Sequence, residues 1–149
     1  MTLCKNSKLL LTLSLVVFSL SFAACFNCCT PQKRVFFENL KDNQVVPEHF
    51  QVRFGSENLQ IKPAGTDIEN KSAGHFHILI DDPASFTPEG EIIPADANHI
   101  HYGQGETETL LTLSPGKHTL ILQFADGLHR SYGKVLSSKI TVDVQATVP

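Results

Sequence analysis

Apolar and polar residues alternate over several short stretches of this chain, with the two-residue period of a β-strand. In residues 49–56, Phe50, Val52 and Phe54 fall on one side of an extended chain, while Gln51 falls on the other. Strands are predicted on the same grounds over residues 34–40, 49–56, 58–66, 75–81, 99–103, 107–113, 118–124 and 137–146. The chain is therefore expected to be built from short strands.

No stretch of the chain shows a sustained 3.6-residue period with helix caps, so little helix is expected. Turn residues separate the predicted strands: Asp42-Asn43 indicate a turn over residues 41–48, and Pro115-Gly116 indicate a hairpin. About seven to eight short strands at nearly regular spacing predict an all-β fold, an immunoglobulin-like β-sandwich. A closed β-barrel is the competing architecture.

The N-terminus has the pattern of an export signal. Lys5 and Lys8 precede a continuous apolar run over residues 9–22, which has the length of a signal peptide rather than of a membrane-spanning helix. The Ala-Ala-Cys sequence that follows resembles a bacterial lipobox, in which a lipid is attached to the cysteine, here Cys25. Plain secretory cleavage after Ala24 is the alternative.

The chain is accordingly divided into a lipoprotein-type signal peptide (1–24), a tether (25–32) and a single β-sandwich domain (33–149). The remaining length of about 120 residues is enough for one hydrophobic core. With either cleavage the protein is expected to be exported. A lipid on Cys25 would anchor it to the membrane in the cell envelope, in the periplasm or at the outer membrane.

Cysteine usage and charge narrow the function further. All four cysteines lie in the leader or just after it, at Cys4, Cys25, Cys28 and Cys29, so no disulfide cross-links the predicted domain. The leader holds two of the 12 basic residues, so its removal leaves 10 against 15 acidic ones, a net charge of −5. With this charge and no basic stripe, nucleic acid is not an expected partner.

Two His-x-His pairs are the strongest chemical signal: His75 with His77, and His99 with His101. Residues i and i+2 of a strand share one face and lie about 6.6 Å apart. Both imidazoles can then reach one ion at metal–nitrogen distances of about 2.0–2.1 Å. The residues that alternate with the first pair, from Phe76 onward, are apolar and predict the core side. If the two segments are neighbours in one sheet, up to four imidazoles line one surface.

A nitrogen-rich donor set without thiolates suits Cu(II) or Zn(II). Met1 is the only methionine, which excludes a methionine-based Cu(I) site. Metal binding is expected to weaken below about pH 6, because imidazole must be neutral to bind. The competing interpretation is structural, since a histidine on a half-buried strand can bond to backbone or carboxylate groups. Such structural positions are assigned to His118 at a core edge and to His49 at the surface.

The 82–98 loop connects the two His-x-His pairs and contains three prolines. Loops longer than about 12–15 residues in a compact domain are usually functional or disordered, so this loop is expected to form part of the site. His129, in a later loop, is a candidate distal metal ligand or an exposed residue. Gln104 and Glu106 are candidates for orienting the imidazoles from behind.

Three functions are compatible with these features. The leading hypothesis is an exported lipoprotein that binds copper or zinc and acts in metal handling. The second is an envelope binding or scaffolding module without a metal, which presents the 82–98 loop to a protein or glycan that the sequence does not identify. The third, a metal-dependent enzyme, is less favoured, because the chain has no nucleophile elbow, His-Glu-x-x-His helix, phosphate loop or cofactor fingerprint.

Several motifs follow one another along the chain: "RVFFENLKDNQVV", "KPAGT", "GHFHILIDD", "HIHYGQGETET", "LSPGKHTLILQFAD" and "SSKITVDV". Together, over residues 33–146, they resemble the bacterial domain of unknown function family 4399. The resemblance implies a small exported β-domain behind a signal peptide. It aligns Gly74–Asp81 and the segment from His99 onward with the family's two His-x-His motifs, with Tyr102 where Phe is usual. It also aligns His129 with the first of two loop histidines, of which the second is absent here.

Overall fold

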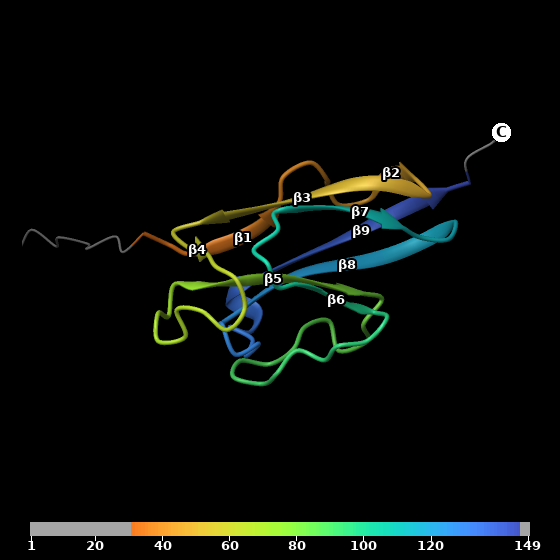
Figure 1. Ribbon diagram of the computed structural model, residues 1–149. Helices are drawn as coiled ribbons and strands as arrows, with labels where there is room; N and C mark the ends of the chain where they lie inside the picture. Colours follow the sequence, from red (N-terminus) through yellow and green to blue (C-terminus); the bar gives the residue numbers. More distant parts are fainter. Residues whose placement is uncertain (1–30, 147–149) are drawn as a thin grey trace, which may run out of the picture.

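The computed structural model describes residues 31–146 and shows an all-β fold in two facing layers (Figure 1). The strands are β1 (Arg34–Phe37), β2 (Gln44–Pro47), β3 (His49–Glu57), β4 (Gln60–Ile61), β5 (Ala73–Ile80), β6 (His99–Tyr102), β7 (Glu108–Thr112), β8 (Gly116–Ala125) and β9 (Ser137–Gln145). One turn of 3-10 helix, η1 (Lys134–Leu136), precedes β9. The prediction of an all-β, immunoglobulin-like sandwich is confirmed.

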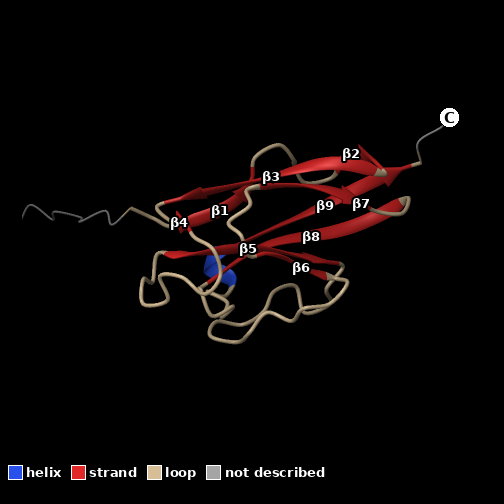
Figure 2. Cartoon of the chain, in the orientation of Figure 1, coloured by secondary structure: helices blue, strands red, loops and turns tan. Residues whose placement is uncertain are grey.

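The strands divide into a three-stranded sheet, in the order β1–β3–β7, and a six-stranded sheet that contains β2–β9–β8–β5 (Figure 2). On the side of β5 away from β8, the short strands β4 and β6 pair with different parts of it. β5 is therefore bonded on both sides. This central position explains why the strand is buried along its whole length.

The main hydrophobic core lies between the two sheets. Phe50, Val52 and Phe54 of β3 are buried there together with Phe76 and Ile78 of β5. The rings of Phe54 and Phe76 contact each other across the layers, with centroids 5.3 Å apart. Burial of each such side chain contributes about 1.5–3 kcal/mol. In β3 and β5 the side that the alternating pattern assigned to the core therefore does face the main core.

The segment 41–48 differs from its prediction, because its second half is the strand β2 and not part of a turn. Asn43 has a φ of 59° and forms the predicted reversal. Its amide donates to the Thr141 carbonyl at 2.7 Å, and the Asp42 carboxylate accepts the Thr141 amide at 2.8 Å. These bonds align the chain in parallel with β9. β2 is therefore a strand in addition to the eight that were predicted. It forms because it pairs with β9, a distant partner that no local pattern reveals.

The outer face of the six-stranded sheet is also buried, because the 82–98 loop covers it. Leu79 of β5 and Ile121 of β8 pack with Ile93 and Phe86 of the loop in a second, smaller hydrophobic cluster. Figure 1 shows the loop on the side of β5 and β6 that faces away from β3 and β7. The predicted histidine face does point away from the main core. At β5 this face is an interior layer, however, and not the surface that was expected, whereas His101 of β6 is exposed.

The predictions for the N-terminus lie outside the described residues. These are the signal peptide of residues 1–24, the lipidation site Cys25 and most of the tether of residues 25–32. Within residues 31–146, no helix is long and apolar enough to cross a membrane.

Candidate metal centre

Strand pairing places three polar side chains in one row across the outer face of the six-stranded sheet. His77 of β5 lies opposite His101 of β6 on one side and opposite Gln123 of β8 on the other. Paired residues point to the same face of a sheet, so all three lie on the face that the 82–98 loop covers. His75, two residues before His77, shares this face.

Three of the predicted histidines converge there. The ring centroids of His75 and His77 are 4.9 Å apart, and that of His101 lies 4.9 Å from His75 and 5.0 Å from His77. One nitrogen from each ring lies within 4.8 Å of the other two. On a tetrahedral ion, with metal–nitrogen distances of about 2.1 Å, two such nitrogens lie about 3.4 Å apart. The nitrogens would therefore have to approach one another by at most about 1.4 Å to bind one ion together.

His129 reaches the same place from a separate segment, the 126–130 turn that follows β8. Its ring centroid lies 4.8 Å from that of His101, 5.0 Å from His75 and 6.2 Å from His77. The predicted distal histidine thus lies beside the cluster. The loop that carries it is more than 20 residues away from either His-x-His pair in sequence, so only the tertiary structure shows the contact.

His99, the remaining predicted ligand, is not brought into this cluster. It pairs with Leu79 in the next row of the sheet. Its Nδ1 lies 2.7 Å from the Asp96 carboxylate and its Nε2 lies 3.2 Å from the Asp82 carboxylate. Burial alone would lower the pKa of His99, but the two carboxylates outweigh it, and the pKa is raised. Both ring nitrogens are therefore occupied by protein partners.

His118 and His49 also have protein partners. His118 lies half-buried at the edge of the core, as predicted, with Nδ1 2.7 Å from the Asp81 carboxylate and Nε2 2.9 Å from the Ser114 carbonyl. His49 is exposed, as predicted, and its Nδ1 lies 2.9 Å from the Thr112 hydroxyl. Both residues thus have the structural role that was expected of them, with ring nitrogens bonded to other protein groups.

The two innermost histidines lack such partners. His75 is 0% exposed and His77 is 1% exposed. Their Nε2 atoms lie 3.1 Å apart, and among the described residues the Nδ1 atoms of both have no hydrogen-bond partner. Buried polar groups are nearly always satisfied, and exceptions often mark a functional site or a missing ion. A hydrogen bond between the two Nε2 atoms satisfies one nitrogen of each ring, whereas a structural role gives no partner to the two buried Nδ1 atoms.

The protonation state of the cluster suits a cation. Burial, together with the neighbouring imidazoles, lowers the pKa of His75 to about 4 and that of His77 to about 2. Partial burial, followed by the nearby His129, also lowers the pKa of His101. These three rings are therefore neutral at pH 7. Neutral imidazole is the form that binds a metal.

Two carboxylates act on the cluster through their charge. Asp126 and Glu106 oppose the lowering of the pKa of His75, and Glu106 does the same for His101. Gln104 and Glu106 were predicted to orient imidazoles, but their hydrogen bonds do not show this role. The backbone amide of Gln104 donates instead to the Glu106 carboxylate at 2.8 Å. Glu106 thus contributes negative charge, which favours a bound cation.

A buried glutamine, which the sequence analysis did not single out, attaches the 82–98 loop to the sheet. Gln123 is 0% exposed. Its side-chain oxygen accepts the Thr87 amide at 2.9 Å, and its nitrogen donates to the Thr87 carbonyl at 2.7 Å and to the Ser131 hydroxyl at 2.6 Å. The Ser131 hydroxyl donates in turn to the Thr87 carbonyl. One side chain beside His77 therefore connects the loop with the segment after the 126–130 turn.

Replacement of Gln123 by alanine is expected to lower the free energy of unfolding by about 2–4 kcal/mol, because it removes three buried hydrogen bonds and leaves the Thr87 amide without a partner. Urea unfolding measures the loss, and limited proteolysis shows whether the 82–98 loop opens. Gln104→Ala, at an exposed position, is the matched control and should change stability by less than about 0.5 kcal/mol. Equal stability of the two variants would contradict the anchoring role.

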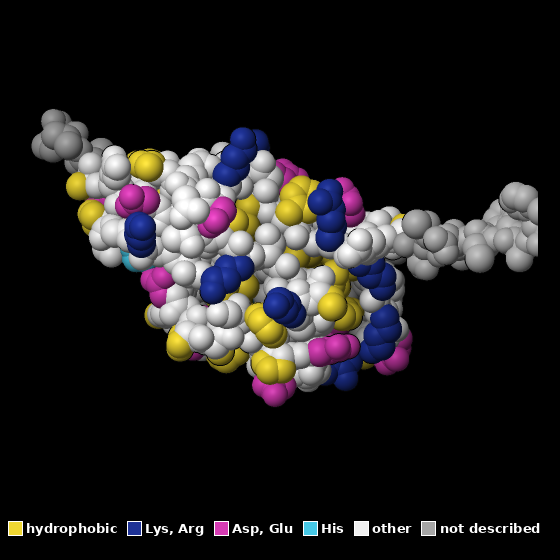
Figure 3. All heavy atoms as spheres, turned by 180° about the vertical axis from the view of Figure 1, so that it is seen from behind, with side chains coloured by type: hydrophobic (Ala, Val, Ile, Leu, Met, Phe, Trp, Pro, Cys, Tyr) yellow, Lys and Arg dark blue, Asp and Glu magenta, His cyan; other side chains and the backbone are white. Residues whose placement is uncertain are grey.

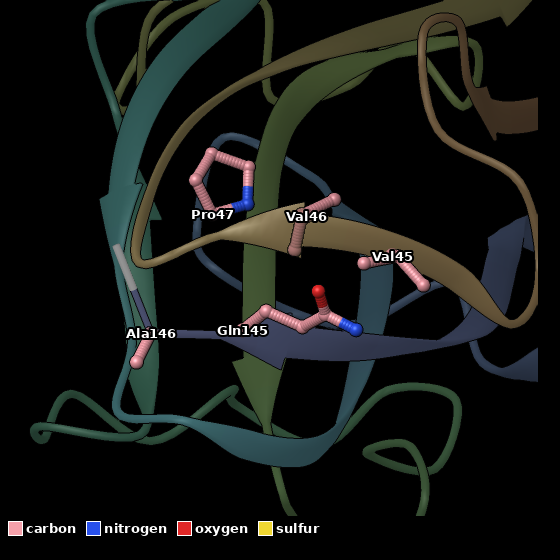
Figure 4. A pocket seen from close by; sticks show the side chains of 5 residues that line it. All are labelled: Val45, Val46, Pro47, Gln145 and Ala146. Atoms are coloured by element: carbon pink, nitrogen blue, oxygen red, sulfur yellow. The ribbon is translucent and has the colours of Figure 1, made fainter. Parts of the chain in front are cut away.

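Two other parts of the described surface are less suited to binding a metal or nucleic acid. A hollow of about 270 Å³ lies where β2 and β9 run side by side (Figure 4), and it is lined by Val45, Val46, Pro47, Gln145 and Ala146. This lining contains no titratable side chain. On the face shown in Figure 3, basic and acidic side chains are interspersed, unlike the continuous basic stripe of a nucleic-acid interface.

Comparison with known proteins gives one family and one structure. The family model described as a domain of unknown function (DUF4399) matches residues 52–145, which include all four clustered histidines. No curated protein matches the chain. A solved structure of Clostridium thermocellum CbhA fibronectin(III)-like modules is similar at 14% identity with a TM-score of 0.44, covering 76% of this chain and 99% of that one.

Proposed function

Since the chain belongs to the DUF4399 family, a domain of unknown function, we propose its function from its own site: this protein binds a divalent transition metal, copper or zinc. His75, His77 and His101 are the proposed ligands. The observation that carries the proposal is the convergence of their nitrogens within 4.8 Å on two neighbouring strands. The buried pair lacks any other hydrogen-bond partner among the described residues, which supports the same conclusion.

The donor set supports copper or zinc over other ions. Imidazole nitrogens suit Zn(II) and Cu(II), whereas Mg(II) and Ca(II) take oxygen ligands. No carboxylate or thiolate belongs to the group of converging ligand atoms among the described residues. The ligands are neutral, so the nearby charges of Asp126 and Glu106 offset part of the charge of the ion.

The N-terminal sequence supports a location in the cell envelope. The signal-peptide pattern and the lipobox-like sequence before Cys25 support export and lipid anchoring, so we propose a membrane-anchored, exported metal-binding lipoprotein. In an oxidising envelope, a site built from histidines avoids ligands that would be lost to disulfide formation. Such a protein would act in metal handling rather than in catalysis.

Metal content tests the proposal. The chain, purified without a histidine tag, is analysed by elemental mass spectrometry and then titrated with Cu(II) and Zn(II). We expect near-stoichiometric binding with submicromolar affinity for at least one of them, and no competition from Mg(II) or Ca(II). Failure of both metals to bind below micromolar concentration would overturn the proposal. The 82–98 loop would then become the place to search for a protein or glycan partner.

Replacement of Gly103 by alanine is expected to weaken metal binding by about 10- to 100-fold, the range for changes that disturb how a ligand is held. A Cβ at this position would overlap the His101 imidazole, so the ring would have to move. Because His101 is exposed, its ring can rotate into solvent with little loss of stability. Competition titration measures the affinity, and urea unfolding of the metal-free protein serves as the control. Unchanged affinity would remove His101 from the ligand set.

A further inference from the structure

The 126–130 turn is folded around one buried carboxylate. Asp126 is 5% exposed. One of its carboxylate oxygens accepts the amides of Leu128 at 2.8 Å and Arg130 at 3.0 Å, and the other accepts the Arg130 Nε at 2.8 Å. Its backbone carbonyl accepts the His129 amide at 2.9 Å. Asp126 thus bonds to three of the four residues that follow it.

Burial by itself would raise the pKa of Asp126, but these hydrogen bonds and the Arg130 guanidinium outweigh it, and the pKa is lowered. The carboxylate therefore stays ionised well below neutral pH. Ionised acceptors make hydrogen bonds about twice as strong as neutral ones. The turn is consequently held by charge-assisted hydrogen bonds at neutral pH.

Neighbouring segments hold the turn from outside. The Gly65 amide donates to the Gly127 carbonyl at 2.7 Å, and the Ile93 amide of the 82–98 loop donates to the His129 carbonyl at 3.1 Å. A Cβ on Gly127 would lie 2.5 Å from the Thr66 carbonyl oxygen, so the turn packs directly on that backbone. Little freedom is left for the position of the turn.

Within this frame, His129 has a left-handed backbone conformation, with a φ of 65°. This conformation is uncommon for a residue with a Cβ and persists where the surrounding structure requires it. The result is a ring centred 4.8 Å from that of His101 and 5.0 Å from that of His75. The uncommon backbone conformation of His129 thus places its imidazole against the other three.

We propose that His129 is the fourth metal ligand and that Asp126 is the positioning residue that holds it in the site. This inference rests on the proposed metal-binding function and adds to it a coordination number and a reason for the buried carboxylate. Four imidazoles from three separate segments would enclose the ion. A structural or exchangeable site closed in this way has no open position for substrate, in contrast to catalytic zinc sites with three protein ligands.

Counting imidazoles on bound copper tests the proposal. Cu(II) is added at one equivalent, and pulsed electron paramagnetic resonance measures how many imidazole rings couple to the ion. We expect four in the wild type and three in His129→Ala. Asp126→Ala should also give three and bind about 10- to 100-fold more weakly, whereas Asp126→Asn, which retains an acceptor oxygen for the two amides, should keep four. Copper held by the N-terminal cysteines is common to all variants and cancels in the comparison.

The outcomes separate the two proposals. No histidine-bound copper in the wild type would refute the metal-binding function itself. Equal imidazole counts in the wild type and His129→Ala would refute the fourth ligand and leave the three-histidine site standing. Four imidazoles in Asp126→Ala would refute the positioning role, as would three in Asp126→Asn, which would assign the effect to charge instead.

If Asp126→Ala does not fold, Gly127→Ala displaces the same turn against the Thr66 backbone without changing the carboxylate. Three imidazoles in that variant would support the positioning of His129 by the turn. Four imidazoles with an unchanged spectrum would overturn it. Urea unfolding of each metal-free variant confirms that only folded protein is compared.

Discussion

Replacing His75 and His77 together by asparagine is expected to lower the affinity for Cu(II) and Zn(II) by more than about 100-fold. Changes in residues that merely support a ligand cost 10- to 100-fold, so the loss of two ligands should cost more. The two side chains are the most deeply buried members of the cluster, and they supply the 3.1 Å pair of nitrogens. Competition titration against a chelator of known affinity measures the change.

The matched control is His99→Asn. His99 belongs to the second His-x-His pair, but its nitrogens bond to Asp96 and Asp82 instead of facing the cluster. We expect this variant to bind copper and zinc with an affinity within about threefold of the wild type. If His99→Asn weakens binding as strongly as the double replacement, the assigned ligand set is wrong. If neither change has an effect, the cluster does not bind the metal.

Acid is expected to destabilise the metal-free domain between about pH 6.5 and pH 4, because His75 and His77 accept protons at a lower pH in the folded domain than in the unfolded chain. Their pKa values are lowered to about 4 and about 2 in the folded state, against about 6.5 in the unfolded chain. The unfolded state therefore binds more protons in this window, and stability falls as the pH falls. At pH 5 the loss amounts to roughly 2 kcal/mol for each of the two histidines relative to pH 7.

Two other histidines act in the opposite direction. Burial lowers the pKa values of His99 and His118, but their carboxylate partners outweigh it, and both pKa values are raised. The stability that these two histidines contribute is therefore present below the pKa of the unfolded chain and is lost as the pH rises through the pKa of the folded state. They offset part of the acid loss. Urea unfolding at pH 7, 6 and 5 measures the net effect in the wild type and in His75→Asn/His77→Asn. A slope that is equally steep in the double variant would contradict the assignment to the buried pair.

The lowered pKa values also change the pH range expected for metal binding. From ordinary imidazole values, binding should weaken below about pH 6. In the folded domain, protons compete poorly for His75 and His77, so binding should persist to lower pH, with His101 the first of the three to be lost. Sequence alone could not predict this shift, because it arises from burial and from the crowding of the rings in the folded domain.

Local patterns were sufficient for much of the fold. Alternation in β3 identified its buried side, and in β5 it identified the face toward the main core, because a strand's side chains alternate between faces whatever its neighbours are. The strand β2 was missed because its hydrogen bonds go to β9, about 100 residues away, and its own pattern is that of a turn. Pairing over such a separation leaves no local signal.

The candidate site, like the fold, was partly predictable from local sequence and partly dependent on contacts between distant residues. The two His-x-His motifs are visible in sequence, and the strand period alone puts His75 and His77 on one face. Which histidines meet could not be predicted. His99 and His101 share a face, yet the register places one opposite Leu79 with carboxylates on both sides and the other opposite His77.

The sequence by itself determined that this protein is an all-β domain with a doubled histidine motif, because strand periodicity and ligand chemistry act over a few neighbouring residues. Only the tertiary structure decided that His101 and His129 join His75 and His77, that Asp126 and Gln123 hold the surrounding loops, and that His75 and His77 are buried while His101 stays exposed. Those outcomes depend on strand register and loop packing, and both are set by contacts between residues far apart in the chain.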